Sequence, residues 1–156
     1  NTYGPRQSNR AVIPTIISQI ASGKRKIKLG SLYPTRDFNF VQDTCNAFKA
    51  VAKSDFCTGR VINSSSNFEI SIMQTAQMIS EIMNVEIEII SDDVRIRPKD
   101  SEVNRLYGDN KLLKELTDWE PKFAGIEGFK KGLRITIDWF TNKENLDLYK
   151  TNLYAI

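Results

Sequence analysis

The chain carries its most informative pattern in Thr35-Arg36-Asp37-Phe38-Asn39-Phe40-Val41-Gln42-Asp43, directly after Pro34. The apolar residues that follow Asp37 predict a short strand, and Asp43 is predicted to cap a helix that follows it. Upstream of Pro34, apolar and lysine side chains alternate over residues 26–29, which predicts a second short strand. The proline is therefore expected to lie in the turn between the two strands.

Hydrophobic residues at helical spacing predict five helices with polar or glycine boundaries. We expect them from about Pro14 to Gly23, from Asp43 to Ser54, from Ser71 to Asn84, from Asn110 to the break at Trp119-Glu120-Pro121, and from Ile126 to Phe140. Ser71 with Gln74 forms a capping box. In the second helix the expected buried stripe is Cys45, Phe48, Val51 and Ala52. The two tryptophans, Trp119 and Trp139, are expected to be packing residues.

Two further strands are predicted, one at Val61-Ile62 and one over residues 85–89, where apolar and acidic residues alternate. Helices alternating with short strands indicate a mixed α/β module, but the strands are too few and too short for a complete doubly wound sheet. They are therefore expected to need partner strands, and a chain without those partners should expose sheet edges and apolar patches.

Composition excludes several classes of function. The 156 residues, 40% hydrophobic and 26% charged, are those of one ordinary soluble globular domain, and no apolar run is long enough to span a membrane. The chain has no histidine, which argues against a zinc site or a nucleophile activated by histidine. A net charge of +3, with the basic residues in short clusters, argues against a nucleic-acid partner and suits a small anionic ligand. The cytoplasm is the expected compartment.

Four motifs occur in a fixed order: Asn1-Thr2-Tyr3-Gly4-Pro5, residues 35–43, Val61-Ile62-Asn63-Ser64-Ser65, and Arg97-Pro98 followed by Asp109-Asn110-Lys111. Together they resemble the C-terminal, substrate-binding half of the extended short-chain dehydrogenases/reductases that act on nucleotide sugars. The resemblance runs from Asn1 to about Phe140. It implies an α/β, Rossmann-type fold whose main parallel sheet is missing, with residues 1–156 as the substrate-binding portion and the N-terminal dinucleotide-binding portion absent. The start within the Asn1 motif agrees with a piece of a longer enzyme.

The resemblance also implies a set of substrate-binding residues. The arginine of the 35–43 segment would face the substrate nucleotide, and the arginine before Pro98 would hold the diphosphate, for which a planar guanidinium is well suited. One residue of the first helix would approach the substrate through its backbone, and the strand after that helix would line the base pocket. The glycine expected after Asn63 is replaced by serine. The full set is Asn1, Val12, Ile27, Lys28, Leu29, Arg36, Asn63 and Arg97.

No catalytic, cofactor or metal residues are expected in this chain. None of the eight glycines forms a Gly-x-Gly-x-x-Gly loop, so this chain alone is not expected to hold a dinucleotide. The resemblance implies NAD as the cofactor of the intact enzyme. Tyr107 and Lys111 have the Tyr-x-x-x-Lys spacing of the family's catalytic pair, but Gly108 and Asp109 would interrupt the helix that such a pair needs. The family's own pair lies upstream of the Asn-x-Tyr-Gly-Pro motif. The chain alone is therefore expected to be inactive.

Residues 97–106, with Thr117-x-Trp119-x-Pro121-Lys122, look most like the 4,6-dehydratases of nucleotide-linked N-acetylhexosamines. A nucleotide-sugar 4-epimerase is the alternative within the family, because the residues that separate the two reactions lie beside the catalytic tyrosine. The implied partners are a nucleotide-diphosphate sugar and, in the intact enzyme, a second copy in a homodimer. A stand-alone, non-catalytic module that binds a nucleotide or a protein remains open as a different class of function, and so does an α/β domain with chance matches.

Overall fold

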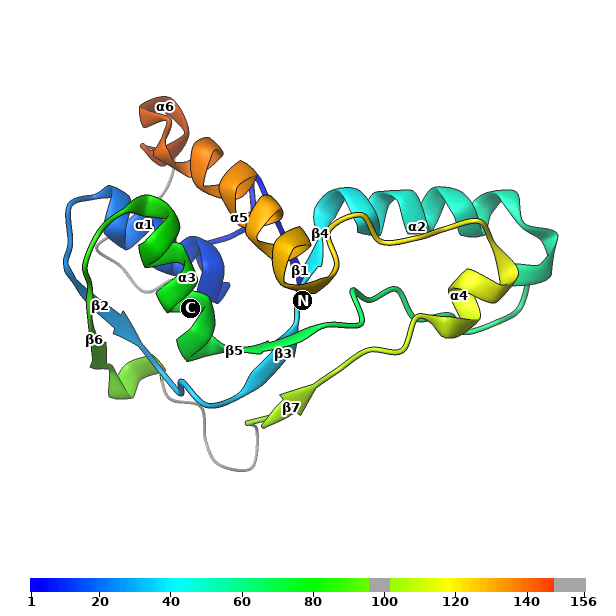
Figure 1. Cartoon of the computed structure of the whole chain (residues 1–156), viewed down its shortest axis with the longest axis horizontal. Coiled ribbons are helices and arrows are strands. Elements are labelled where there is room, and N and C mark those ends of the chain that lie inside the picture. Colours follow the sequence, from blue (N-terminus) through cyan, green and yellow to red (C-terminus); the bar gives the residue numbers. More distant parts are fainter. Residues whose placement is uncertain (96–101, 148–156) are drawn as a thin grey trace.

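The computed structural model of this chain describes residues 1–95 and 102–147, and helices outweigh strands in that part (Figure 1). The α-helices are α1 (Val12–Ala21), α2 (Val41–Lys53), α3 (Ile72–Met83), α4 (Lys111–Leu116), α5 (Gly125–Thr141) and α6 (Lys143–Leu146). The 3-10 helices are η1 (Asp55–Cys57) and η2 (Asp93–Arg95). The strands are β1 (Thr2–Tyr3), β2 (Lys26–Leu29), β3 (Thr35–Asp37), β4 (Asn39–Phe40), β5 (Glu69–Ser71), β6 (Glu88–Ser91) and β7 (Arg105–Leu106).

The strands form three small sheets within the described residues. β1 pairs with β4 and β2 pairs with β6, both in parallel. The third sheet has the order β5-β3-β7, in which β3 is antiparallel to β5 and parallel to β7. The expected α/β chain with a few short strands is thus confirmed.

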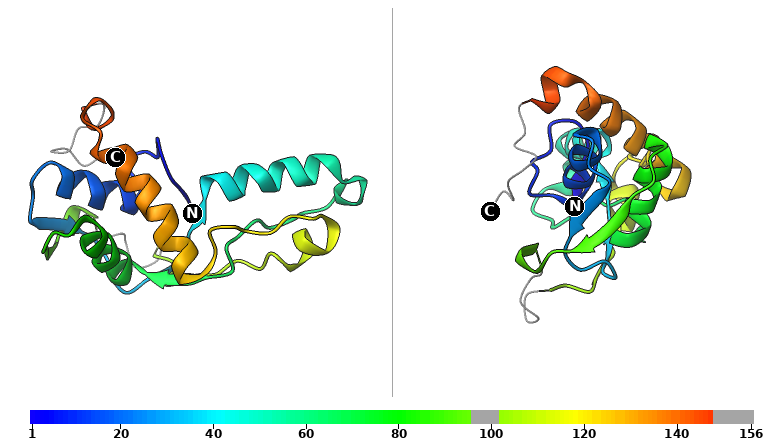
Figure 2. Two further views of the ribbon diagram at one scale, coloured as in Figure 1. Left: turned by 45° about the horizontal axis from the view of Figure 1, so that its top comes forward. Right: turned by 90° about the vertical axis from the view of Figure 1, so that its left-hand side faces the viewer.

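The elements divide between two regions of the molecule. Helices α1 and α3 lie next to the β2-β6 pair with α5 and α6 beyond them, whereas α2 and α4 form an arm on the other side (Figures 1 and 2). The larger hydrophobic core lies in the first region and joins α1, α3 and α5 with Tyr3, Phe38 and Phe40. A smaller cluster in the arm centres on Ala47, Leu113 and Trp119. Burial of Trp119 agrees with its predicted packing role.

Helix α1 forms as its sequence predicts. Pro14 lies in the first turn, where its missing N–H costs no hydrogen bond. Ile13, Ile16, Ile17 and Ile20 are all buried. Gly23 has φ +84°, the left-handed conformation that ends a helix, and its N–H donates to the carbonyl of Ile20 at 2.9 Å.

Helix α3 has the predicted boundaries. The Ser71 hydroxyl accepts from the N–H of Gln74, and the Gln74 side chain accepts from the N–H of Ser71, both at 3.1 Å. Asn84 ends the helix in the left-handed conformation. The strand after it, β6, begins at Glu88 and not at Val85. Its partner strand β2 begins at Lys26, which pairs with Glu88, so the residues before Glu88 have no strand residue opposite them.

The strand predicted after Asp37 forms only as the short β4, and a separate strand, β3, lies before Phe38. The two strands have different partners, so the chain must bend between them. Val41, expected to end this strand, instead begins helix α2.

Two predictions for helix α2 are wrong. Asp43 does not cap the helix: it lies inside the first turn, is 1% exposed, and accepts the main-chain N–H groups of Lys122 and Phe123 at 3.0 and 2.9 Å. The predicted stripe is also largely exposed, with Phe48 72% exposed. The helix instead turns Asp43 and Ala47 inward, because the segment after α4 packs there and the Trp119 indole donates to the Asp43 carbonyl at 3.0 Å.

The predicted strand at Val61-Ile62 does not form among the described residues. The segment lies in irregular backbone, Val61 is 92% exposed, and Ile62 packs partly against the cluster of the arm. A strand needs a hydrogen-bonded neighbour, and no described strand lies beside this segment.

Helix α5 confirms the long closing helix, with Phe129, Leu133, Ile137 and Phe140 buried on one face. Helix α4 is shorter and buries only Leu113. It begins at Lys111, so Tyr107 lies before the helix and the Tyr-x-x-x-Lys spacing does not fall on one helical face. No helix in the described part of the chain has the length and apolar character needed to cross a bilayer.

Candidate functional site

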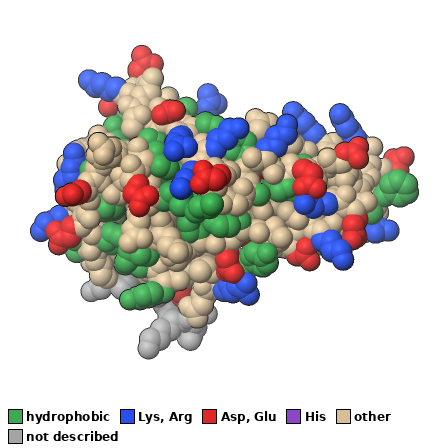
Figure 3. Space-filling model, viewed as in Figure 1, with side chains coloured by type: hydrophobic (Ala, Val, Ile, Leu, Met, Phe, Trp, Pro, Cys, Tyr) green, Lys and Arg blue, Asp and Glu red, His purple; other side chains and the backbone are tan. Residues whose placement is uncertain are grey.

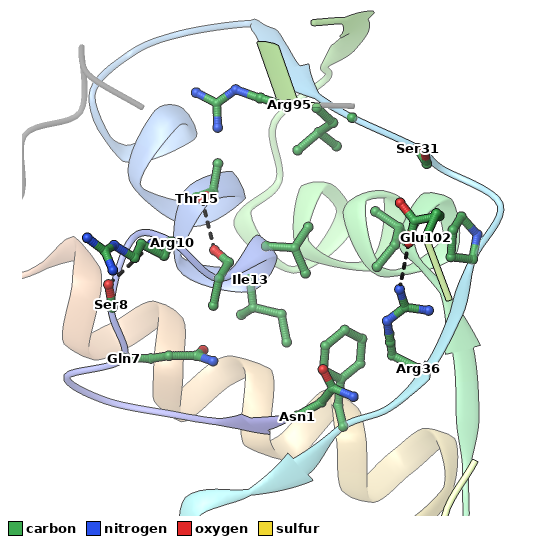
Figure 4. A pocket seen from close by; sticks show the side chains of 17 residues that line it. Asn1, Gln7, Ser8, Arg10, Ile13, Thr15, Ser31, Arg36, Arg95 and Glu102 are labelled. Atoms are coloured by element: carbon green, nitrogen blue, oxygen red, sulfur yellow. Dashed lines mark hydrogen bonds and ion pairs between the residues drawn. The ribbon is translucent and has the colours of Figure 1, made fainter. Parts of the chain in front are cut away.

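A cavity of about 490 Å³ lies where the loop before α1, the end of β2, strand β3 and η2 meet (Figure 4). Its walls carry three arginines, Arg10, Arg36 and Arg95, and one carboxylate, Glu102. Ile13, Leu29 and Phe38 supply apolar surface. An open cavity with several cations, few acids and apolar patches suits a ligand that combines a negative charge with flat or apolar parts.

Four of the predicted substrate-binding residues meet in this cavity: Asn1, Val12, Leu29 and Arg36. They come from four separate parts of the sequence. The main-chain carbonyl of Asn1 accepts the N–H of Asn39 at 3.1 Å, which places the first residue beside β4. This convergence could not be read from spacing alone.

Three of the other predicted residues, Ile27, Lys28 and Asn63, do not line the cavity. Within β2 the side chains alternate, so Ile27 is fully buried in the core and Lys28 is exposed. The main chain of Lys28 exchanges hydrogen bonds with the side chain of Gln19, at 3.0 and 3.3 Å. Asn63 is exposed in the segment beside the arm and is not among the cavity residues. Arg97 lies outside the described residues.

Arg36 is held tightly by its own chain. One terminal nitrogen donates to the carbonyls of Thr35 and Val103 at 2.8 and 2.7 Å, and the other donates to Glu102 at 3.0 Å. Its side chain is 11% exposed. The guanidinium therefore fixes the 102–103 segment against β3 and gives the cavity a rigid wall at this point.

Asp37, the next residue, joins three segments that are distant in sequence. One carboxylate oxygen accepts the N–H and the hydroxyl of Ser66 at 2.8 and 2.6 Å, and the other accepts the N–H groups of Asn67 and Gly108 at 3.0 and 3.3 Å. A carbon at Cβ of Gly108 would lie 2.3 Å from Cβ of Ser65, so only glycine allows this approach. The carboxylate thus holds the 65–67 and 107–108 loops beside the strand that carries Arg36.

Tyr3 anchors the Asn1 motif in the core. It is 1% exposed, makes edge contacts with Phe38, Phe40 and Phe129, and donates its hydroxyl to the Phe129 carbonyl at 3.3 Å. Burial, with a smaller contribution from the charge of Asp43, raises the pKa of the Tyr3 hydroxyl far above its ordinary value. The hydroxyl therefore stays protonated in the core and donates a hydrogen bond there.

Sequence reasoning missed three charged residues of the cavity: Arg10, Arg95 and Glu102. Arg95 stands two positions before Arg97, and Glu102 follows the Arg97-Pro98 motif. Their closeness in sequence to this motif is the one signal that could have identified them as site residues. Arg10 lies in an irregular loop, where no periodicity indicates which way a side chain points. Within residues 1–95 and 102–147, no three His, Cys, Asp or Glu side chains gather as a metal site would require.

The chain matches the family model described as GDP-mannose 4,6 dehydratase over residues 1–132. It is 32% identical over 145 residues to the GDP-6-deoxy-D-mannose reductase of Pseudomonas aeruginosa, covering 89% of this chain and 45% of the relative. It is 30% identical over 160 residues to the dTDP-D-glucose 4,6-dehydratase of Homo sapiens, covering 96% and 41%.

Solved structures agree with these matches. A dTDP-glucose 4,6-dehydratase from Bacillus anthracis, in complex with NAD, superimposes with a TM-score of 0.74 at 26% identity, covering 94% of this chain and 44% of the other. A UDP-N-acetylglucosamine 4-epimerase from Methanobrevibacter ruminantium, in complex with UDP-N-acetylmuramic acid, gives 0.72 at 27%, covering 90% and 43%. The chain spans less than half the length of each of these proteins. It belongs to the GDP-mannose 4,6 dehydratase family, among the extended short-chain dehydrogenases/reductases of nucleotide sugars.

Proposed function

We propose that this chain is the substrate-binding portion of an NAD-dependent nucleotide-sugar 4,6-dehydratase. The observation that carries the proposal is the convergence of Asn1, Val12, Leu29 and Arg36 on one cavity that also holds Arg10 and Arg95. A nucleotide-diphosphate sugar combines a flat base, two negative charges and a polar sugar, and the cavity offers apolar, cationic and amide groups to match.

The residues of the cavity would bind and orient the substrate. Leu29 and Phe38 present apolar surface to the base, the arginines attract the diphosphate, and Asn1 presents an amide to the sugar. Arg97 and Asn63 remain predictions for the same substrate. Binding of the nucleotide, which does not itself react, would fix the position of the sugar. NAD, held by a separate dinucleotide-binding portion, would supply hydride transfer to and from the sugar.

Exposed apolar side chains support an association with such a portion. Phe48, Phe56 and Val61 are 72%, 74% and 92% exposed, and they lie on α2, on η1 and in the segment after η1. Large exposed apolar patches commonly mark an interface. We propose that the dinucleotide-binding portion covers them, and that the intact enzyme is a homodimer.

Titration calorimetry of the chain with UDP-N-acetylglucosamine, dTDP-glucose, GDP-mannose and NAD tests the binding role. We expect one of the nucleotide sugars to bind and NAD to give no heat. Failure of all three sugars at millimolar concentration would reject the cavity as a substrate site. Binding of a nucleotide by a chain that never associates with a dinucleotide-binding portion would favour the stand-alone module.

A 4-epimerase is the second candidate, because the matching structures include 4-epimerases, among them that of Methanobrevibacter ruminantium. The reaction can be assigned with the chain joined to a dinucleotide-binding portion. A dehydratase releases a 4-keto-6-deoxy sugar nucleotide, whereas an epimerase returns a sugar of unchanged mass. Mass spectrometry of the product separates the two outcomes.

A further inference from the structure

A short segment, residues 64–67, is held by polar side chains from two other parts of the chain. Asp37 binds the last two residues of the segment, and the Asn110 amide donates to the carbonyl of its second residue at 2.9 Å. The Asn39 amide nitrogen donates to the hydroxyl of its first residue, Ser64, at 3.2 Å. All three side chains belong to buried residues, so the segment is fixed against the interior of the molecule.

Asn63 stands directly before this segment and is exposed. It is one of the residues predicted to bind the substrate, although it does not line the cavity. A polar side chain on a fixed main chain loses less conformational entropy when it binds a ligand than one on a loose loop does. The segment therefore presents the Asn63 amide from a defined position.

Asn39 also binds the first residue of the chain. Its main-chain N–H donates to the carbonyl of Asn1 at 3.1 Å, at the point where β1 and β4 begin to pair. Asn1 lines the cavity (Figure 4). One buried residue thus holds Asn1 through its main chain and the segment after Asn63 through its side chain. The two asparagines that are predicted to bind the substrate are therefore tied to the same point.

Stability alone does not explain an amide at position 39. The Asn39 Nδ2 donates to the Thr44 hydroxyl at 2.9 Å as well as to Ser64, but Oδ1 is buried and accepts no hydrogen bond from the described residues. A buried acceptor without a donor lowers stability, and an apolar side chain of similar size would avoid this cost. The amide is better explained by the group that its nitrogen holds in place.

We infer that Asn39 is a positioning residue, which sets Asn63 relative to Asn1 so that both amides meet one nucleotide-diphosphate sugar. The ligand extends from the cavity past Asn1 toward Asn63, and Asn39 itself does not touch it. This arrangement allows Asn63 to belong to the site although it lies outside the cavity wall. The inference rests on the proposed function, so its test must separate the action of Asn39 through Asn63 from binding by the chain as such.

The experiment is a double-mutant cycle, measured by calorimetry with UDP-N-acetylglucosamine, dTDP-glucose and GDP-mannose. Asn39→Ala removes the side-chain bonds and keeps the main-chain bond to Asn1, and we expect it to weaken binding about fivefold. Asn63→Ala should weaken binding by at least as much. The double variant should bind no more weakly than Asn63→Ala alone, because Asn39 acts through Asn63. Thr136→Val, which removes a buried hydrogen bond within α5, should leave the affinity unchanged.

Unchanged affinity in a folded Asn39→Ala chain would overturn the inference while the proposed function stands. Losses that add in the double variant would overturn it as well, because a general structural defect weakens binding equally with and without Asn63. Absence of binding by the wild-type chain rejects both proposals. Circular dichroism shows whether each variant is folded. If Asn39→Ala unfolds, Ser64→Ala, at an exposed residue, takes its place and should give the same loss and the same lack of additivity with Asn63→Ala.

Discussion

Gly132 of α5 lies directly against the hydroxyl of Tyr3, so that a Cβ on Gly132 would stand 2.1 Å from Tyr3 Oη. This contact fixes the first motif of the chain to its last long helix. The Tyr3 ring has little room to retreat, because Phe38, Phe40 and Phe129 surround it. The position of Asn1 in the cavity therefore depends on a glycine far along the sequence.

Gly132→Ala should destabilise the chain. Overpacking of a well-filled core costs about 1–3 kcal/mol, which exceeds the gain of up to about 1 kcal/mol from the higher helix propensity of alanine. Urea unfolding gives the difference, with Arg134→Ala, at an exposed site of the same helix, as the control. A more stable Gly132→Ala variant would show that Tyr3 can move away.

Tyr3 should make stability depend on pH in the alkaline range. Burial raises its pKa in the folded state, so the unfolded chain loses the proton first. The stabilisation from the protonated hydroxyl is complete below the unfolded pKa of about 10, and it is lost as the pH rises toward the folded value. Between pH 8.5 and 11 the wild type should lose about 1 kcal/mol more than Tyr3→Phe in urea unfolding. Equal slopes for both proteins would contradict this.

Asp37→Ala should lower the free energy of unfolding by roughly 3 kcal/mol, because it leaves the buried N–H of Ser66 and the part-buried N–H groups of Asn67 and Gly108 without an acceptor. Asp37→Asn should cost less. Asp138→Asn, at an exposed site, serves as the matched control. A loss below about 1 kcal/mol for Asp37→Ala would mean that water or other groups replace the carboxylate.

Arg36→Lys should weaken nucleotide-sugar binding about tenfold and lower stability by about 1–3 kcal/mol. A lysine ammonium cannot reach two carbonyls and Glu102 with the geometry of the arginine fork. Calorimetry and urea unfolding measure the two effects, and Arg60→Lys is the control. If a folded Arg36→Lys chain binds the nucleotide sugar with full affinity, the planar guanidinium of Arg36 is not needed for binding.

Phe48→Ser combined with Val61→Ser should reduce self-association of the isolated chain, because both side chains are exposed and apolar. Sedimentation velocity across a concentration series gives the oligomeric state. Tyr33→Ser changes a residue that is 91% exposed at another site and should have no such effect. A wild-type chain that is monomeric at all concentrations would show that this surface does not self-associate.

Local sequence signals predicted the elements that depend on local interactions. The capping box of Ser71 and Gln74, the glycine after α1 and the apolar face of α5 all act within one helix, so their outcome could be stated in advance. Asp43 shows the limit. Helix α2 begins within one turn of Asp43, as an aspartate near a helix start predicts. The Asp43 carboxylate, however, accepts hydrogen bonds from the main chain of Lys122 and Phe123, which no local pattern reveals.

The candidate site was predictable only in part for the same reason. Arg36 and Leu29 belong to recognisable motifs, whereas Arg10 and Arg95 enter the cavity through loops and a short turn. The helical spacing of apolar residues predicts a buried stripe on α2, but this spacing alone does not show which face of the helix packs against the rest of the protein. Phe48 shows this, because it lies on the predicted stripe and remains exposed.

Strand β3 joins three segments of the described chain that are distant in sequence: Thr35 pairs with Ser71 of β5 and with Arg105 of β7. Contacts of such long sequence separation close large loops, and they are slow to form during folding. The cavity wall at Arg36 therefore exists only when these three segments have come together. A ligand bound there would slow the unfolding of the whole domain, and it would not protect only a single loop against hydrogen exchange.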